Sequence, residues 1–197
     1  MVRRGQYAKG AAKRAEILAV ALDVVAELGT RKASNREIAT RVGLTQAGLM
    51  HYFSTREDLF LEVLRARDER DHEQFYSPDH GIDGFLDVIA HNASVPGLVR
   101  LYVEYSAEAT IEGHPARAFF EKRFAWVRKL IADAVVHDQA AERMGPDVDV
   151  PYVADLVIAA ADGLQVQWLL DPSIDMADRL ARLWQGIREA SWPTVLA

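Results

Sequence analysis

The sequence predicts an all-α protein, and three observations support this. Apolar residues recur at three- and four-residue steps in one segment after another, which is the spacing of one face of an α-helix. Alternation of apolar and polar residues between turn dipeptides, the pattern of β-strands, is weak throughout. Half of the 197 residues are hydrophobic, which is enough to build a core.

Helix-start and helix-end signals divide the chain into segments. A first helix is expected over residues 8–28, because Gly29 can end it. A cap at Ser54 or Thr55 opens an amphipathic helix that continues through the charged run 65–73 as a connector. Further helices are expected over residues 82–93, 98–111, 116–143, 152–170 and 175–191.

The stretch from Ser34 to Glu57 has the sequence form of a helix-turn-helix. Ser34 and Glu37 match a capping box, in which each side chain satisfies a backbone amide at a helix start. Gly43 can adopt the left-handed conformation that ends a helix, and Thr45 can cap the next one. These signals predict two short helices at an angle, an arrangement that can place the second in the major groove of DNA.

The second helix of this motif is expected to expose small or hydrogen-bonding residues at its leading end. Such residues allow close approach to base edges, and larger residues behind them can reach phosphates. An ordinary helical hairpin packed into a bundle is the alternative, and the turn by itself does not separate the two. The predicted outward-facing residues are Thr45, Gln46, Ala47, Gly48, His51 and Tyr52.

Charge is distributed unevenly along the chain, whose formal net charge is −6. Residues 1–56 hold ten Lys and Arg against four Asp and Glu, a net charge of +6, whereas residues 57–197 hold thirteen against twenty-five, a net charge of −12. A basic head would meet phosphates, and an acidic remainder would turn away from them. We therefore expect one domain over residues 1–56 and a second over residues 57–197.

The first residues form a basic lead-in, whose tip is expected to be disordered. Such an arm can contact the DNA backbone or the minor groove, although a solvated tail is the plainer interpretation. Arg31 and Lys32, in the loop before Ser34, are also placed to reach a phosphate. The cations of the arm are Arg3, Arg4, Lys9, Lys13 and Arg14.

Residues 13–64 resemble the N-terminal DNA-binding domain of the TetR family of transcriptional regulators. The resemblance is carried by the core IATRVGLTQAGLMHYF, the polar joint STRED and the helix LFLEVL. It implies that Ser34, Asn35 and Arg36 lie in the DNA-binding unit and that Arg56 contacts phosphate. Met50 departs from the family pattern, which has a tyrosine there, so His51 and Tyr52 are the better candidates for that phosphate contact.

The resemblance also implies a homodimeric regulator, most readily a repressor, that a small-molecule effector releases from a palindromic operator. The run DGLQVQWLLDPSID resembles a C-terminal dimerisation region, and the nearly all-apolar segment 152–170 needs cover on more than one side. The expected interface residues are Leu156, Ala160, Leu164, Leu180, Leu183, Trp184 and Ile187.

An effector pocket is expected in the acidic domain, where aromatic and polar residues alternate on buried-looking helices. Pockets between bundle helices are mostly apolar with a few polar anchors. The alternative is that the aromatic residues belong to the core and line no cavity. The candidate pocket residues are Tyr102, Glu104, Tyr105, Phe120, Phe124, Asp162, Gln165 and Trp168.

Other classes of protein receive little support from the sequence. A di-iron bundle requires two Glu-x-x-His pairs, and only Glu69 with His72 fits; zinc, phosphate-loop and nucleophile motifs are missing, so no catalytic residue, metal or cofactor is predicted. The chain has no cysteine, its start has no apolar core, and we expect no apolar run long enough to span a bilayer, which suits the cytoplasm. A helical ligand-binding or interaction protein without DNA binding, and a bundle metalloenzyme, remain as alternatives.

Overall fold

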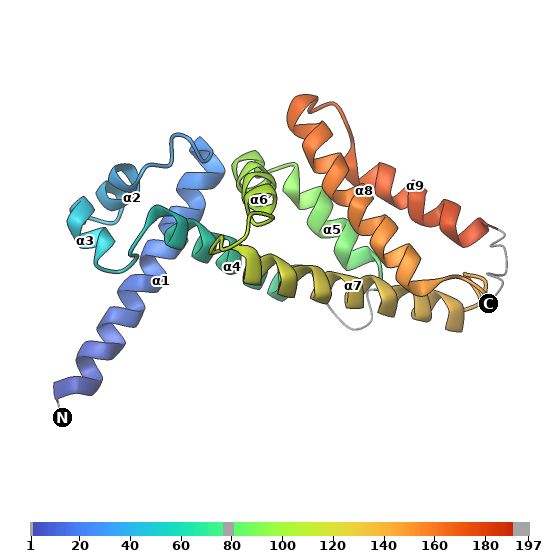
Figure 1. The fold of residues 1–197 in the computed structure, drawn as a ribbon, viewed down its shortest axis with the longest axis horizontal. Helices are drawn as coiled ribbons and strands as arrows, with labels where there is room; N and C mark the ends of the chain where they lie inside the picture. The colour runs from blue at the N-terminus through green and yellow to red at the C-terminus, as the bar shows by residue number, and fades with distance from the viewer. Residues whose placement is uncertain (1, 77–80, 191–197) are drawn as a thin grey trace. The chain divides into compact units, whose positions relative to one another are not determined.

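The computed structural model describes residues 2–76 and 81–190, and the side chains of these residues from 9 onward. The described residues form helices without a β-strand, which confirms the all-α prediction (Figure 1). The helices are α1 (Val2–Leu28), α2 (Asn35–Arg41), α3 (Gln46–Met50), α4 (Arg56–Phe75), α5 (Asp83–Asn92), α6 (Pro96–Glu108), α7 (Arg117–Ala140), α8 (Val150–Leu170) and α9 (Met176–Glu189).

The first helix is longer than expected. It begins at Val2 rather than near residue 8, so the backbone of the basic lead-in is helical where a disordered tip was expected. Its second half carries the predicted apolar stripe, in which Ile17, Ala21, Val24 and Val25 are fully buried. Gly29 ends the helix with a φ of 73°, as predicted.

The turn between α2 and α3 closes by backbone hydrogen bonds. Gly43 has a φ of 67°, and its N–H donates to the Thr40 carbonyl at 3.2 Å, while the Leu44 N–H donates to the Ala39 carbonyl at 2.8 Å. This pair of bonds is a Schellman motif, which satisfies the last carbonyls of α2. The Thr45 Oγ1 then accepts the Gly48 N–H at 3.0 Å and caps α3, as predicted.

The start of α2 uses half of the predicted capping box. The Ser34 Oγ accepts the Glu37 N–H at 3.1 Å, as expected. The Glu37 carboxylate does not accept the Ser34 N–H. It accepts from the Arg41 Nε at 2.8 Å, and the Ser34 N–H donates instead to the Lys32 carbonyl at 2.8 Å.

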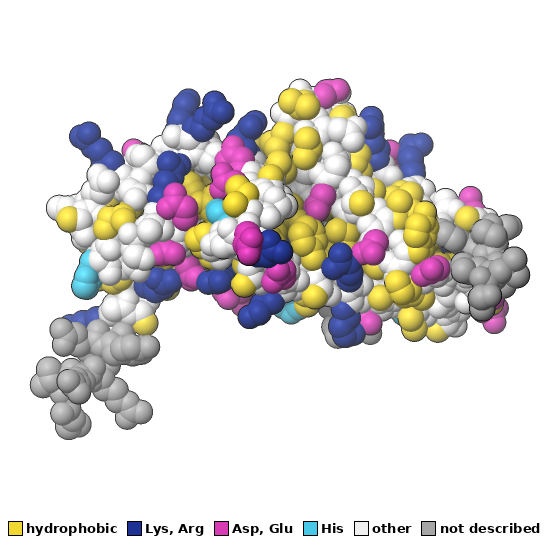
Figure 2. All heavy atoms as spheres, viewed as in Figure 1, with side chains coloured by type: hydrophobic (Ala, Val, Ile, Leu, Met, Phe, Trp, Pro, Cys, Tyr) yellow, Lys and Arg dark blue, Asp and Glu magenta, His cyan; other side chains and the backbone are white. Residues whose placement is uncertain are grey.

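Figure 2 shows Lys and Arg side chains standing out from the surface around α2 and the loop before it.

The described residues pack as two units that do not follow chain order. The first unit holds residues up to 72 together with residues 95–116, and the second holds residues 73–94 together with residues from 117 onward. Helix α6 thus belongs to the unit that contains the helix-turn-helix and packs against α1, although it comes after α5 in the chain. In α4, Arg67 is buried, and its Nη1 donates to the Leu98 carbonyl of α6 at 3.4 Å.

Gly97 sets the closeness of α6 to α1. A Cβ atom built on Gly97 would lie 1.8 Å from the Val25 carbonyl oxygen and 2.9 Å from the Ala26 carbonyl oxygen. Real Cβ atoms do not approach backbone oxygens this closely, so the start of α6 reaches the end of α1 only because residue 97 has no side chain. The sequence offers no sign of this contact, since the two positions are far apart in the chain.

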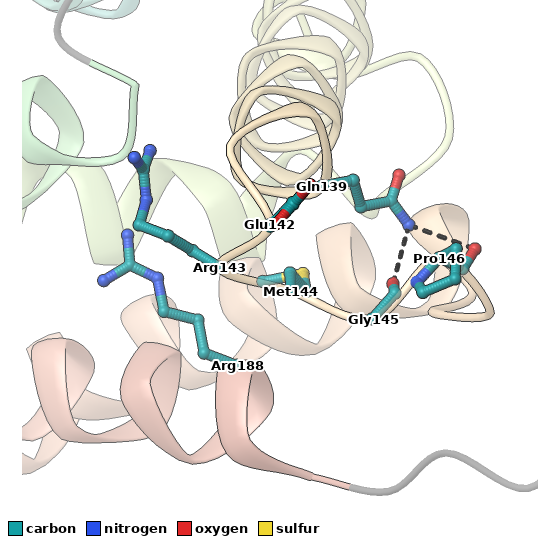
Figure 3. Close-up of a pocket in the computed structure, with 7 residues that line it drawn as sticks. All are labelled: Gln139, Glu142, Arg143, Met144, Gly145, Pro146 and Arg188. Carbon is teal, nitrogen blue, oxygen red and sulfur yellow. Dashed lines mark hydrogen bonds between the residues drawn. The ribbon is translucent and has the colours of Figure 1, made fainter.

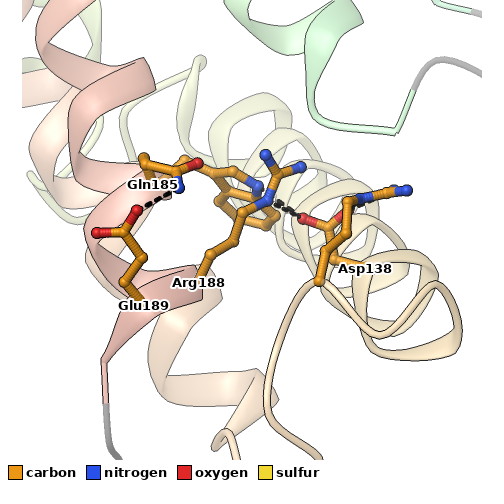
Figure 4. Close-up of polar contacts among 6 residues, drawn as sticks. Asp138, Gln185, Arg188 and Glu189 are labelled. Atoms are coloured by element: carbon orange, nitrogen blue, oxygen red, sulfur yellow. Dashed lines mark hydrogen bonds and ion pairs between the residues drawn. The ribbon is translucent and has the colours of Figure 1, made fainter.

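In the second unit, α8 packs against α7 and α9, and α9 also packs against α5. Asp138 of α7 is 2% exposed and binds three donor side chains (Figure 4). It accepts from the Arg143 Nε and Nη2 at 2.9 and 2.7 Å, from the Trp184 Nε1 at 2.9 Å and from the Arg188 Nε at 2.6 Å. Figure 3 shows the guanidinium groups of Arg143 and Arg188 side by side. Asp138 therefore ties the end of α7 to α9.

The environment of Asp138 has opposing effects on its ionisation. Burial by itself would raise the pKa of this carboxyl, but the hydrogen bonds from Arg188, Arg143 and Trp184 favour the charged form and hold the pKa below its ordinary value. The ionised carboxylate is therefore the form that the native structure stabilises.

Helix α8 corrects one expectation about apolar runs. Among the described helices, it is long and apolar enough to cross a bilayer by length and composition. Core helices of globular proteins meet the same description, and Val153, Val157, Ala161 and Trp168 of α8 are buried within the second unit. The apolar character of α8 is therefore accounted for in part by packing inside its own unit.

We predict that Gly97→Ala destabilises the protein by at least about 2 kcal/mol, because the new methyl group forces α6 away from the Val25 carbonyl. Gly10→Ala is the matched control, since a Cβ at this helical position meets no atom within 4 Å and alanine favours the helix. Urea unfolding followed by circular dichroism measures both. Equal stabilities of the two variants would contradict the close approach.

We predict that Asp138→Asn lowers the free energy of unfolding by about 1–3 kcal/mol at pH 7, because two guanidinium groups lose their buried carboxylate. The native pKa of Asp138 is depressed, so its contribution is complete above the ordinary carboxyl pKa and is lost as the pH falls through the native value. The difference between wild type and variant should therefore shrink in acid. Asp133→Asn is the control, since Asp133 is exposed and, among the described residues, pairs only with Lys129 one turn away. A difference that is independent of pH would argue against the ionised state.

Candidate nucleic-acid interface

Two cations of α1 fix the position of the helix-turn-helix. The Lys13 Nζ donates to the Val42 carbonyl at the end of α2 at 2.9 Å. The Arg14 Nη1 donates to the Tyr52 carbonyl at 2.8 Å, and its guanidinium lies 4.2 Å from the centre of the Phe53 ring. Both residues belong to the basic lead-in, for which a solvated tail or a contact with DNA was expected. In the structure they bind carbonyl groups near the ends of α2 and α3.

The apolar side of α3 is buried and its other side faces solvent. Leu49 is fully buried, and Phe53 is buried just beyond the helix. The residues predicted to face outward divide by exposure: Gly48 and Tyr52 are half-buried, and the exposed members are Thr45, Gln46, Ala47 and His51. The exposed side of α3 thus has small and hydrogen-bonding residues at its leading end, with an imidazole behind them.

The three candidates at the start of α2 have different surroundings. Ser34 is exposed and caps α2. Asn35 is half-buried, its Nδ2 lies 3.2 Å from the Met50 Sδ, and its Oδ1 is buried without a hydrogen-bond partner in the described part of the chain. Arg36 is exposed and forms no ion pair with a described residue. Arg36 is therefore the member of this group with a charge available for a phosphate.

Arg56, the candidate phosphate contact at the start of α4, has partners inside the protein. Its Nη2 donates to the Thr30 carbonyl, and its guanidinium lies over the Phe60 ring, 4.6 Å from the ring centre. These contacts join the loop between α1 and α2 to the first turn of α4. Thr55 caps this turn by accepting the Asp58 N–H at 3.0 Å, so of the two expected caps the structure uses Thr55.

The cations around α2 divide into paired and available ones. Arg41 binds the carboxylates of Glu27 at 2.6 Å and Glu37 at 2.8 Å, which uses its charge within the protein. Arg31 and Lys32, like Arg36, are exposed and form no ion pair with a described residue. Positive charge is thus available in the loop before α2 and on α2 itself.

The predicted pocket residues fall in both packing units. In the first unit, Tyr102 and Tyr105 of α6 are buried and Glu104 is half-buried. In the second unit, Phe120 and Phe124 of α7 have ring centres 6.2 Å apart, and on α8 Gln165 and Trp168 are buried while Asp162 is half-buried.

Each unit contains a cavity lined by described residues. The cavity of the first unit has a volume of about 380 Å³ and lies at Thr30, Arg31, Arg56, Glu57, Phe60, Glu104, Tyr105 and Glu108. We call it the α1–α4–α6 cavity. The cavity of the second unit has a volume of about 450 Å³ and lies beside Arg143 and Arg188 (Figure 3). Of the predicted pocket residues, Glu104 and Tyr105 line the first cavity.

The predicted interface residues also separate by exposure. Leu180, Trp184 and Ile187 of α9 are already buried within the single chain. The remaining members keep part of their surface in solvent: Leu156, Ala160, Leu164 and Leu183.

Comparison with known proteins gives a consistent result. Residues 17–63 match the family model described as bacterial regulatory proteins, tetR family. The chain is 24% identical over 179 residues to the HTH-type transcriptional regulator PksA of Bacillus subtilis, with 87% of the chain and 85% of PksA covered. It is 27% identical over 154 residues to the HTH-type transcriptional repressor KstR2 of Mycobacterium tuberculosis, covering 72% and 74% of the two chains.

A solved structure shares the fold. The transcriptional regulator from Rhodococcus sp. Rha1 superimposes with a TM-score of 0.66 at 18% identity, over 90% of this chain and 99% of the other. The fold, the relatives and the family match agree with the helix-turn-helix geometry of α2 and α3. The resemblance to the TetR family of transcriptional regulators is thereby confirmed, and residues 17–63 are the part of the chain that matches the family model.

Proposed function

We propose that this DNA-binding regulator is a homodimeric repressor that places α3 of each protomer in successive major grooves of a palindromic operator. The observation that carries the proposal is the exposed side of α3, held by the Thr45 cap and flanked by the available charges of Arg31, Lys32 and Arg36. In this geometry the two recognition helices are separated by roughly 34–36 Å, one turn of DNA. The role needs no catalytic group and no cofactor, and it is exercised in the cytoplasm.

The residues of α3 divide into base and phosphate contacts. Gln46 is exposed in the first turn, and its amide can form two hydrogen bonds with an adenine edge. Thr45, Ala47 and Gly48 are small enough to let the helix approach the groove. His51 and Tyr52 follow behind, where phosphates lie, and Arg36 supplies charge from α2. Arg56 supports this surface from within the protein through Thr30.

Dimerisation is assigned to α8 because its free side is apolar. Tyr152, Leu156, Ala159, Gly163, Val166 and Leu170 follow one another at steps of three or four residues, and each keeps solvent exposure. A continuous apolar stripe of this kind is costly in water, and the same stripe on a second copy would cover it through two-fold symmetry. Ala160, Leu164 and Leu183 lie at part-exposed positions of α8 and α9 that can join this contact.

Release by an effector requires that the ligand bind more tightly to a state with wrongly spaced heads. The α1–α4–α6 cavity supports such a role, because its wall includes Arg56 and Thr30, which adjoin the helix-turn-helix.

We predict that two variants of the proposed DNA-facing surface differ in whether their effect on binding depends on the DNA sequence. Gln46→Ala should weaken binding to the operator by about 1–3 kcal/mol and alter the preferred base at one position of each half-site. Arg36→Gln should weaken binding to operator and random duplex alike, and it should reduce the slope of log affinity against log salt by about 0.9 for each phosphate that the variant no longer neutralises. Fluorescence anisotropy with labelled duplexes at several salt concentrations measures both effects.

Arg182→Gln is the control for the DNA experiment, because it removes an exposed Arg from α9. Its affinity and salt slope should equal those of the wild type. If Gln46→Ala weakened binding to random and operator duplexes equally, the base-reading role of Gln46 would be wrong.

We predict that Val166→Glu converts the dimer to monomers, because it places a charge in the apolar stripe of α8. Val166 is 45% exposed in the protomer, so the fold should tolerate the change. Val136→Glu is the matched control, since Val136 is 55% exposed on α7 outside the stripe. Sedimentation velocity distinguishes the two states, and a dimer that persists in Val166→Glu would exclude the α8 interface.

A further inference from the structure

The α1–α4–α6 cavity has a negatively charged wall. Glu57 comes from the first turn of α4, and Glu104 and Glu108 come from the end of α6. Neither Glu57 nor Glu104 has an ion-pair partner among the described residues, and the Glu108 carboxylate lies 3.5 Å from the His114 Nε2. Three carboxylates therefore face one cavity against two arginines, Arg31 and Arg56.

The carboxylates of this cavity act on the ionisation of Tyr105. Its pKa is raised, first by burial of the phenol and then by the charges of Glu57, Glu108 and Glu104, which outweigh the opposing effect of Arg56. Burial disfavours a charge of either sign at the phenol, whereas the carboxylates act only against a negative one. The effect of the three carboxylates on Tyr105 therefore shows that they lie close enough to act on this point of the cavity.

The floor of the cavity is aromatic. Phe60 and Tyr105 are buried, with ring centres 6.3 Å apart. The guanidinium of Arg56 lies on the Phe60 ring and donates to the Thr30 carbonyl, so the cavity already holds one organic cation, supplied by the protein itself. Thr30 is 4% exposed, and its Oγ1 has no hydrogen-bond partner in the part of the chain that the structure describes.

We propose that the α1–α4–α6 cavity binds a small organic cation, a protonated primary amine that carries an aromatic or alkyl group. The ammonium is held by Glu57, Glu104 and Glu108, and the apolar group lies against Phe60 and Tyr105, as carboxylates and aromatic faces together recognise organic cations. The volume of about 380 Å³ is within the range of small-molecule sites. This inference names a ligand class for the effector and so rests on the proposed function, but amine binding itself does not depend on DNA.

Isothermal titration of the full-length protein with benzylammonium chloride, at neutral pH, constant ionic strength and without DNA, tests the site. We expect saturable binding of one amine per chain. The double variant Glu57→Gln/Glu104→Gln should weaken it by at least about tenfold, because the two carboxylates without a protein partner are replaced by neutral isosteres. Glu69→Gln, an exposed site on α4 outside the cavity, makes the same chemical change and should bind as the wild type does.

Two further comparisons make the result decisive. Benzyl alcohol has the shape of the amine without its charge, and it should bind at least about tenfold more weakly. Glu104→Gln alone serves as a second variant if thermal melting shows that the double variant is unfolded. The proposal is overturned if the amine does not bind, if the alcohol binds equally well, or if the cavity variants retain wild-type affinity. Failure of the protein to bind an operator would leave each of these results unchanged.

Discussion

The presentation of α3 depends on how the carbonyl groups at the end of α2 are satisfied. Gly43 reverses the chain with a φ of 67°, and the amides of Gly43 and Leu44 satisfy two of these carbonyls. The Val42 carbonyl remains, and Lys13 of α1 binds it at 2.9 Å. The angle between α2 and α3 is therefore set locally, and the Lys13 hydrogen bond attaches the pair to α1. The exposed side of α3 therefore faces solvent in an orientation that the contacts with α1 hold in place.

The free surfaces of the protein follow from what its own packing leaves uncovered. In the first unit, Arg41 is neutralised by Glu27 and Glu37, so positive charge remains at Arg31, Lys32 and Arg36. In the second unit, α8 buries one side against α7 and α9 and leaves an apolar stripe on the other. The exposed positive charge and the apolar stripe therefore lie on different helices, as the proposed dimeric DNA-binding role requires.

Local signals in the sequence were enough to predict the helix-turn-helix. The caps at Ser34 and Thr45 and the left-handed Gly43 each act within a few residues, and the structure confirms them. Contacts between distant positions were not predictable in this way. Nothing in the local pattern distinguishes Lys13 and Arg14 from a DNA-binding arm, because their carbonyl partners lie 29 and 38 residues away. The internal contact of Arg56 was not predictable either, since its partner Thr30 is 26 residues away in the chain.

The sequence also did not predict that α6 belongs to the same unit as the helix-turn-helix. This grouping depends on Gly97 lying against the Val25 carbonyl, and a glycine near a helix start does not by itself indicate a close helix crossing. Apolar periodicity predicted which side of α9 is apolar. It could not show that Leu180, Trp184 and Ile187 are buried within the chain itself, whereas the apolar stripe of α8 stays exposed to solvent.

Selection of bound duplexes from a random pool tests whether α3 reads DNA, because the experiment assumes no operator sequence in advance. We expect enrichment of a palindrome whose half-sites are centred about one helical turn apart, roughly 34–36 Å. The Gln46→Ala variant should select a palindrome of the same spacing with an altered base in each half-site. Failure to enrich any duplex at low salt, where phosphate contacts are strongest, would contradict the claim that α3 reads DNA.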